Sequence, residues 1–372
     1  MSIVANLDGD NHAFAYGVFG VQHDELTTAK KQQVSTLHRL LVASAVRVDH
    51  LQDERYGAGD DDTGPKTSVL VASWRRPDDY RHWKQSDAVR RFWDELPDDA
   101  GVWREVMTVP KSSYTFTASQ PVASGAAALF GVKFEEDDGQ GSWGVNRRRL
   151  ARTAAALGAP PDDFASEFQT SAESNREPGR KTLTVPASFP ARIRPGRVKL
   201  TKPPDNLLFF RDGQRQPNLS AAERRSWEEK LQPLARSWFE YLATNRNKHG
   251  VMSFDRLVSR YSEDGSAARA ADLDVGADIQ KDATAILEAG QMGYFLDLGH
   301  FELAGRSFKD HVALVRTAIA LYGPGGPHSG DGRLSIFAEH IVVKSANLDA
   351  EYIGCREGTG LMYLEDADAE GQ

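Results

Sequence analysis

The chain has 372 residues, 40% of them hydrophobic, which is enough to bury a large core in one big domain or two smaller ones. Its net charge of −8 argues against nucleic acid as the main partner. The single cysteine, Cys355, excludes an internal disulfide and any Cys-x-x-Cys motif. No apolar run approaches the roughly 18 residues of a membrane span. The first residues lack the basic start and apolar core of a signal peptide, so we expect a cytoplasmic protein without a membrane partner.

The first part of the chain alternates apolar strands with amphipathic helices after a polar N-terminal tail. Helical spacing of apolar residues and β-branched runs distinguish the two kinds of element. The elements expected there, in chain order, are a strand over 17–22, a helix over 27–48, a buried strand over 68–74, a helix with aromatic anchors over 77–93 and a strand over 101–109 that Pro110 ends.

The second part begins with residues 160–195, which are rich in Pro, Ser, Arg and Ala and predict mostly loop. A capping box at Ser220 and Glu223 predicts the start of a long helix, and Pro233 should kink or split it. The remaining expected elements are a strand over 206–211, the long helix over 220–245, a helix over 306–315, a strand over 334–343 and an acidic, frayed tail over 365–372.

An internal repeat links the two parts. The strand-helix-strand unit over 68–109 recurs over 291–343, and the alignment puts Ala88 where His311 stands. Repeats of this kind favour an α+β fold in which two ferredoxin-like units pack sheet to sheet. We therefore expect a first repeat over 1–125, connecting strands and loop with a distal-pocket segment over 126–218, and a long helix plus the second repeat over 219–372.

His311 is the first candidate for chemistry. It shares an apolar helix face with Phe308, Val315 and Ile319, where an imidazole needs a hydrogen-bond partner or a metal. A core or half-exposed histidine is the plainer reading of the same pattern. The sequence therefore leaves two readings for His311, a metal ligand or a packed side chain.

His340 is the second candidate and lies in a strand. It shares a strand face with Ile336, Ala338 and Val342, while Glu339 and Ile341 point the other way. One ionisable ring in an apolar row could accept and donate a proton near neutral pH. The alternative is a buried histidine that is hydrogen-bonded to backbone. A helix histidine and a strand histidine can face each other across a flat cofactor, one as its ligand and one as an acid/base, which points to haem.

Several segments together resemble one family, the haem-containing aldoxime dehydratases. The resemblance extends over most of the chain and keeps the order of the segments. These segments are Val18-Phe19-Gly20-Val21-Gln22, Trp103-Arg104-Glu105-Val106, Ser142-Trp143-Gly144 with Arg148-Arg149-Leu150, residues 205–214 around Arg211-Asp212-Gly213-Gln214, and residues 351–360 around Cys355 and Gly358-Thr359-Gly360.

The resemblance implies a dimeric α+β barrel-type haem protein built from two ferredoxin-like repeats, with haem b and a homodimeric assembly. It implies dehydration of an aldoxime, R-CH=N-OH, to a nitrile. In that reading His311 is the metal ligand, Phe308 and Val315 contact the cofactor, and His340 is the distal acid/base. The partner is then a small-molecule aldoxime or a related N-hydroxylated compound.

This sequence departs from the family pattern at the distal side. The family's catalytic histidine precedes a glutamate, whereas His340 follows Glu339, so alignment on the glutamate puts Ala338 in the histidine's place. Positions 338 and 340 share a strand face, so the imidazole stays on the pocket side but moves roughly 6.6 Å along the strand unless a bulge restores it. Asp212 stands where the family has a serine.

An aspartate in this position is either ionised and paired, with Arg211 as the expected partner, or neutral and a proton donor. The family's assisting arginine and carboxylate have no single match, and Asp138, Arg148 and Arg176 are the candidates. Two alternatives therefore stay open. One is the same haem fold with a different N–O or N–N dehydration or a peroxidase-like reaction, and the other is a non-catalytic haem-binding protein.

Overall fold

The computed structural model describes residues 2–7, 12–53, 66–137, 144–162, 164–165, 168, 183–261 and 286–365. Asp138, Arg176 and nearly all of the predicted acidic tail lie outside these residues. No helix in the described ranges is long and apolar enough to cross a membrane.

Two units with the same order of elements make up most of the fold. The first consists of β2 (Ala13–His23), α1 (Thr28–Val42), β3 (Arg47–Asp53), β4 (Lys66–Trp74), α2 (Pro77–Gln85), α3 (Asp87–Asp94) and β5 (Val102–Pro110). The second consists of β9 (Leu207–Gln216), α5 (Ala221–Ser226), a π-helix (Trp227–Leu231), α6 (Gln232–Thr244), α7 (Arg246–His249), β10 (Val251–Tyr261), β11 (Ile286–Phe295), α8 (Leu298–Ser307), α9 (Lys309–Tyr322) and β12 (Ser335–Val343).

The strand orders of the two units correspond. The first unit pairs its strands as β5-β2-β4-β3 and the second as β12-β9-β11-β10, with every pair antiparallel. This is the ferredoxin-like β-α-β-β-α-β arrangement in both units. The predicted repeat is therefore confirmed, since β4-α2-α3-β5 corresponds to β11-α8-α9-β12.

One antiparallel sheet of 13 described strands joins both units through β3 and β10. The remaining elements extend its two ends or flank it: β1 (Ser2–Leu7), β6 (Tyr114–Ala118), β7 (Val132–Asp137), α4 (Val145–Ala156), β8 (Arg197–Lys199) and β13 (Leu348–Ile353). β6 extends the second unit beside β12, and β13 extends the first beside β5. The second unit begins at Leu207 in β9, so the boundary expected at 218/219 falls between its first strand and its first helix.

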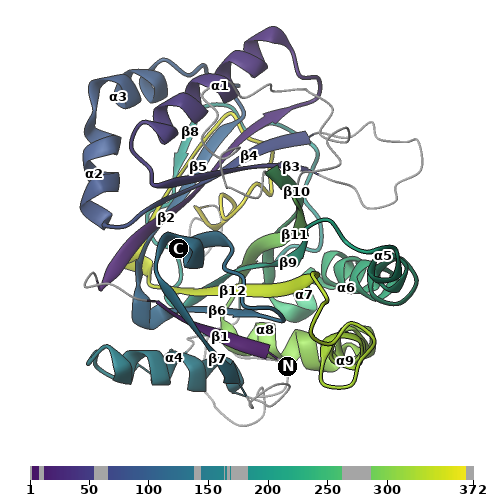
Figure 1. Ribbon diagram of the computed structural model, residues 1–372. Helices are drawn as coiled ribbons and strands as arrows, with labels where there is room; N and C mark the ends of the chain where they lie inside the picture. The colour runs from purple at the N-terminus through teal and green to yellow at the C-terminus, as the bar shows by residue number, and fades with distance from the viewer. Residues whose placement is uncertain are drawn as a thin grey trace.

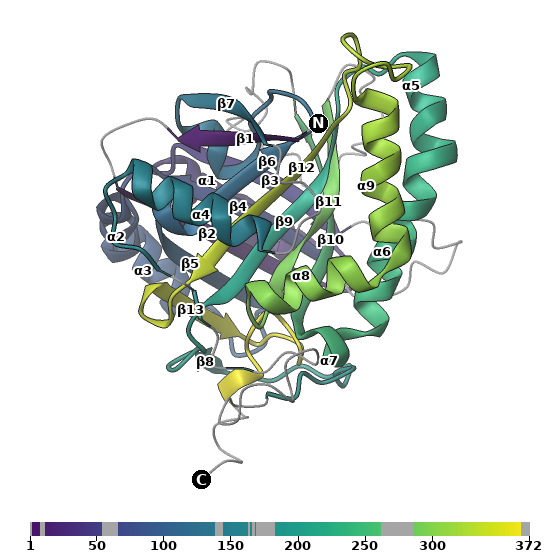
Figure 2. The same cartoon turned by 90° about the horizontal axis from the view of Figure 1, so that it is seen from below.

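The inner faces of the two units pack on each other and the helices cover the outer faces. Tyr16 of β2 contacts Phe209 of β9 at 5.4 Å between ring centroids, and both belong to the largest apolar core. A second core lies under α1, α2 and α3 and a third under α6, α8 and α9. Figures 1 and 2 show these two helical layers on different sides of the sheet, with α6 and α9 side by side. Packing sheet to sheet is thus observed within a single chain.

Several predicted boundaries were wrong. The helix expected over 27–48 ends at Val42, because Arg47–Asp53 pairs with β4 as strand β3. The helix expected over 77–93 breaks at Ser86, whose backbone is extended. The N-terminal tail forms β1, which pairs with β6 and β7.

The long helix shows both predicted features. Ser220 and Glu223 form the capping box, and Pro233 follows a π-helical turn over Trp227–Leu231. Proline lacks the N–H of a regular helical bond, so the preceding turn widens. Within the segment expected to be loop, residues 183–195 contain no helix or strand.

Candidate haem site

His311 lies at the start of α9, just after α8 ends at Ser307. Its Nδ1 atom is 2.8 Å from the carbonyl oxygen of Gly305. That carbonyl belongs to the last turn of α8, where helical carbonyls lack an intrahelical partner. A carbonyl can only accept, so Nδ1 carries the proton and Nε2 keeps its lone pair. This tautomer is the one that a metal-binding histidine uses when a backbone oxygen orients it.

Burial keeps His311 neutral. It lowers the pKa of the imidazole below its ordinary value, against the opposing effects of the Gly305 carbonyl and the charge of Asp212. Trp238 of α6 packs on the ring at 4.5 Å between centroids. A Cβ atom on Gly305 would lie 3.1 Å from the ring, so a glycine here gives the imidazole its room. The ring is therefore held on two sides, with Nε2 available.

Phe308 supports this helix junction from the α6 side. It stacks on Tyr241 at 4.0 Å and on Trp238 at 6.0 Å between centroids. Further along α9, Val315 is half-buried and Ile319 is 39% exposed, although both share the His311 face at helical spacing. The helix thus presents apolar side chains beside His311 that the described protein does not fully cover.

His340 lies on β12 and faces the same helical layer. Its side chain is 6% exposed, and Nε2 is 3.4 Å from Oδ1 of Asp212 on β9. Phe301 of α8 contacts the ring edge at 4.6 Å between centroids. Within the described residues neither ring nitrogen has a hydrogen-bond partner, and the same holds for Oδ1 of Asp212. Buried polar atoms without partners are costly, so this pair is ready to bind a polar ligand.

The structure brings His340 and Asp212 together and places His311 within electrostatic reach of Asp212. Asp212 contacts His340, and its charge is one of those that act on the pKa of His311. Both imidazoles lie on the helix-covered side of the second unit, His311 against Trp238 and His340 against Phe301. The strand face predicted for His340 is confirmed, because its neighbour Glu339 points into the inner core and accepts a hydrogen bond from Tyr114.

The predicted site residues Arg211 and Arg148 lie away from His340. The pairing of Arg211 with Asp212 is wrong, because successive strand residues point to opposite faces. Arg211 is buried between the two units, where it forms ion pairs with Glu288 at 2.6 Å and Asp49 at 3.3 Å. Arg148 is exposed on α4 and its neighbour Arg149 is the buried one.

The neighbouring strands contribute two residues that sequence reasoning missed. Gln291 of β11 stands directly opposite Asp212, and Thr115 of β6 stands directly opposite His340. Directly opposite residues share a sheet face. The alternation along residues 286–295 was the available signal for Gln291, but the partner strand could not be known without the fold.

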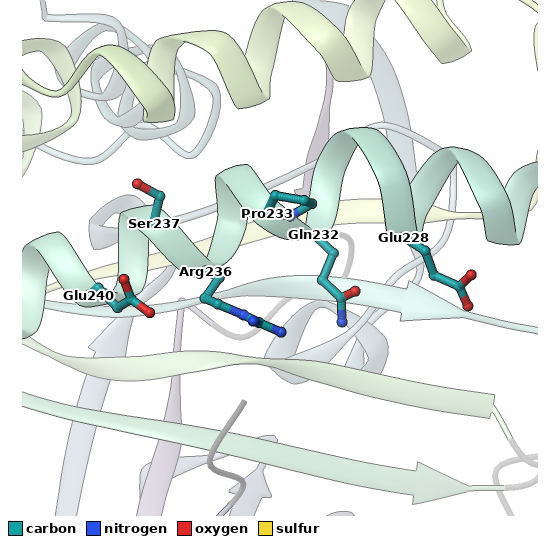
Figure 3. A pocket seen from close by; sticks show the side chains of 6 residues that line it. All are labelled: Glu228, Gln232, Pro233, Arg236, Ser237 and Glu240. Carbon is teal, nitrogen blue, oxygen red and sulfur yellow. The ribbon is translucent and has the colours of Figure 1, made fainter. Parts of the chain in front are cut away.

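A separate surface pocket of about 310 Å³ lies on the flank of α6 (Figure 3). Its described lining is polar and comes from Glu228, Gln232, Pro233, Arg236, Ser237 and Glu240. Ser237 donates a hydrogen bond to Asp310 at 2.7 Å, which ties α6 to the start of α9. None of the three residues His311, His340 and Asp212 lines this pocket. Cys355 is fully buried, and burial raises the pKa of its thiol to about 12, so it is a packed side chain and not a nucleophile.

The fold and these residues define a class: an α+β protein of two ferredoxin-like units with one largely buried histidine on a helix and another on a strand. The sequence model of the haem-containing dehydratases matches residues 17–361. The chain belongs to this family.

Characterised relatives are distant. A phenylacetaldoxime dehydratase of Bacillus sp. (strain OxB-1) is 22% identical over 304 residues, which are 80% of this chain and 74% of that protein. An aliphatic aldoxime dehydratase of Rhodococcus globerulus is 25% identical over 306 residues, 81% of this chain and 73% of that protein. A crystal structure of an aldoxime dehydratase in complex with butyraldoxime superposes with a TM-score of 0.67 at 20% identity and covers 97% of this chain and 88% of its own. The structural likeness establishes the shared fold.

The residues of this chain fit a haem group. A histidine imidazole is a common protein ligand of haem iron, and His311 would offer Nε2 with its other nitrogen bonded to a backbone oxygen. The partly uncovered apolar face of α9 suits the macrocycle. The ring nitrogens of His340 and Oδ1 of Asp212 make no hydrogen bond among the described residues, which suits a polar ligand.

Proposed function

We propose that this protein is a haem b-dependent aldoxime dehydratase, in which His311 holds the iron and His340 is the distal acid/base. The observation that carries the proposal is the asymmetry of the two histidines. Among the described residues the His311 ring has its hydrogen bond at Nδ1, to Gly305, whereas neither nitrogen of His340 has a hydrogen-bond partner. Haem b is the form that needs no cysteine attachment, and Cys355 is fully buried.

The reaction converts R-CH=N-OH to R-C≡N and water. Haem, when bound, supplies an iron atom that can take the substrate nitrogen and shift electron density toward the N–O bond. Hydroxide is a poor leaving group, so His340 donates a proton to the departing oxygen, which leaves as water. The neutral imidazole is then a base that can accept the proton from the substrate carbon as the triple bond forms. General acid–base help of this kind contributes roughly 10²- to 10⁴-fold.

Asp212 has a supporting role in this proposal. Its carboxylate lies beside His340 and stabilises the imidazole when it carries the second proton. Phe301 covers the ring from α8 and limits its rotation. The two side chains keep the acid in one orientation on a rigid strand.

We also propose that the fold is that of the dimeric α+β barrel-type haem proteins and that the protein forms a homodimer. What supports the barrel reading is the face-to-face packing of the two ferredoxin-like units described above. Light scattering at several protein concentrations measures the assembly, and a mass of one chain throughout would contradict the homodimer.

The test compares three single variants in the reduced, haem-loaded protein. His311→Ala should lose haem, while His340→Ala should keep the haem spectrum and lose nitrile formation from an arylaldoxime. The exposed His82→Ala serves as the control and should change neither. Retention of full haem with an unchanged spectrum in His311→Ala would overturn the ligand assignment.

Asp212 favours one second candidate, the same haem fold with a different N–O or N–N dehydration or a peroxidase-like reaction. An acid beside His340 is a different environment from the serine that the resemblance leads us to expect. Turnover with peroxide and none with aldoximes under reducing conditions would favour this candidate. Loosely held haem without any substrate-induced spectral change would instead indicate a non-catalytic haem-binding protein.

A further inference from the structure

Helix α6 carries two oxidisable rings that lead away from His311. Trp238 packs on the His311 ring at 4.5 Å between centroids. Tyr241 follows three residues later and stacks on Trp238 at 6.1 Å, with the ring planes 20° apart. Residues three apart in a helix lie on one face, so the two rings form a ladder along α6. Figure 2 shows α6 beside α9, the helix that carries His311, so the ladder starts at the proposed haem ligand.

The far end of this ladder has a base. The phenol oxygen of Tyr241 lies 2.6 Å from Nε2 of His249, the last residue of α7. Burial lowers the pKa of His249 to about 4, so its imidazole is neutral near pH 7. A phenol is a stronger acid than a neutral imidazole, so we assign this hydrogen bond to the Tyr241 hydroxyl as donor. An oxidised phenol is a much stronger acid still, and its proton then passes to His249.

The chemistry of these side chains favours electron transfer over packing alone. Tryptophan and tyrosine are the aromatic residues that lose one electron most readily, and tyrosine does so with loss of its phenolic proton. Packing does not require either, since Phe308 stacks on Tyr241 at 4.0 Å in the same junction. The first unit also has an aromatic cluster around Tyr80, but there the repeat puts Ala88 where His311 stands. The ladder of the second unit therefore adjoins a candidate haem ligand, and the cluster of the first does not.

We propose that Trp238 and Tyr241 carry a one-electron oxidation away from the haem, with His249 as the base that takes the phenolic proton. The inference needs the haem of the proposed function and goes beyond its aldoxime reaction. The oxidant is a peroxide. Hydrogen peroxide takes up two electrons and two protons and leaves as two molecules of water. One electron comes from the haem group and the other from Tyr241 by way of Trp238, which leaves a neutral tyrosyl radical beside an imidazolium.

The test is electron paramagnetic resonance of the ferric, haem-loaded protein, frozen after mixing with hydrogen peroxide. The wild type should show a tyrosyl radical, and its signal should narrow when the protein contains ring-deuterated tyrosine. Tyr241→Phe keeps the stacked ring and should lose that signal. His249→Gln keeps both rings of the ladder and should also reduce the signal, because an amide is a much weaker base than an imidazole. In both variants peroxide should bleach the haem faster than in the wild type, since the oxidising equivalent has no exit.

Tyr80→Phe is the matched control, because it removes a buried, hydrogen-bonded phenol from the first unit, and it should leave the signal unchanged. Haem content and thermal unfolding, measured in every variant, separate loss of the radical from loss of the haem or of the fold. A tyrosyl signal of wild-type size in Tyr241→Phe would overturn the inference and leave the proposed function intact. The same follows if the haem-loaded wild type forms nitrile but no protein radical. Failure of the wild type to bind haem would overturn both.

Discussion

Nε2 of His340 lies 3.4 Å from Oδ1 of Asp212, across two adjacent strands of the second unit. The side chains are diagonal neighbours, since His340 stands opposite Phe210 and Asp212 opposite Ala338. Diagonal neighbours on one sheet face are within reach of each other. The dyad depends on a register that the rest of β9 and β12 maintains.

A double-mutant cycle tests whether the two residues act as one unit. His340→Ala should lower nitrile formation roughly 10²- to 10⁴-fold, and Asp212→Ala should lower it at least about tenfold, with the haem spectrum preserved in both. The double variant should be no slower than His340→Ala, because residues of one catalytic unit are strongly non-additive. Additive losses in the rate constants would show that Asp212 acts independently of the imidazole.

Gly305→Ala should weaken haem binding. The added methyl group meets the His311 ring at 3.1 Å, and the ring must turn away from the carbonyl that orients it. Disturbing the partner that orients a metal ligand typically costs 10- to 100-fold in affinity. The measurement is haem transfer to apomyoglobin, together with thermal unfolding of the haem-free protein. Unchanged haem retention in a folded variant would argue against the role given to Gly305.

Arg211→Met should destabilise the protein strongly. Arg211 is 3% exposed and pairs with Glu288 and Asp49 between the two units. Removing it leaves two buried carboxylates without that cation, which costs about 3–5 kcal/mol. Arg148→Met is the matched control on exposed α4, where we expect a change within roughly 0.5 kcal/mol. Chemical denaturation of both variants measures the difference, and similar losses in the two would contradict the assignment.

Glu339 gives the fold a pH dependence with a defined sign. It is fully buried and accepts hydrogen bonds from Tyr16 at 3.1 Å, Tyr114 at 2.8 Å and the Ala126 amide at 2.7 Å. Burial nevertheless raises its pKa above the ordinary value of 4.5. The folded state therefore binds the proton more tightly than the unfolded state. Its contribution to stability is complete below pH 4.5 and declines as the pH rises through the folded pKa.

Glu339→Gln removes this titration and keeps the shape of the side chain. The wild type should thus lose stability relative to the variant as the pH rises from 4 toward 8. Thermal unfolding of both proteins across that range measures the difference. A difference that stays constant, or that grows in favour of the wild type with rising pH, would be inconsistent with a raised pKa.

The repeat, and the helix and strand that carry the two histidines, could be predicted from the sequence because each has a local pattern. The apolar periodicity of residues 291–343 is the same as in 68–109, and strand alternation put His340 on one face and Glu339 on the other. Arg211 failed as a partner of Asp212 for the same reason, since the two residues are adjacent in one strand. Alternation alone was sufficient to exclude that pair.

What the sequence could not supply is which strands become neighbours. Gln291 and Asp212 are far apart in the chain, and only the pairing of β11 with β9 makes them opposite. Residues 47–53 show how strand pairing overrides a local pattern. Val48 suits a helical stripe as well as a strand, and pairing with β4 makes the segment a strand. The sheet therefore determines the parts of the site that lack a local pattern.

The extension of the sheet by β6 and β13 has a consequence for how the chain folds. Each unit has its outer edge completed by a segment from outside it: β12 by residues of β6 from the N-terminal half, and β5 by residues of β13 from near the C-terminus. An N-terminal fragment made first would expose the bare edge of β5, and an isolated second unit would expose that of β12. Bare strand edges invite aggregation. β6 is already made when β12 emerges, whereas β5 must wait for β13, so the first unit completes its sheet only when almost all of the chain is available.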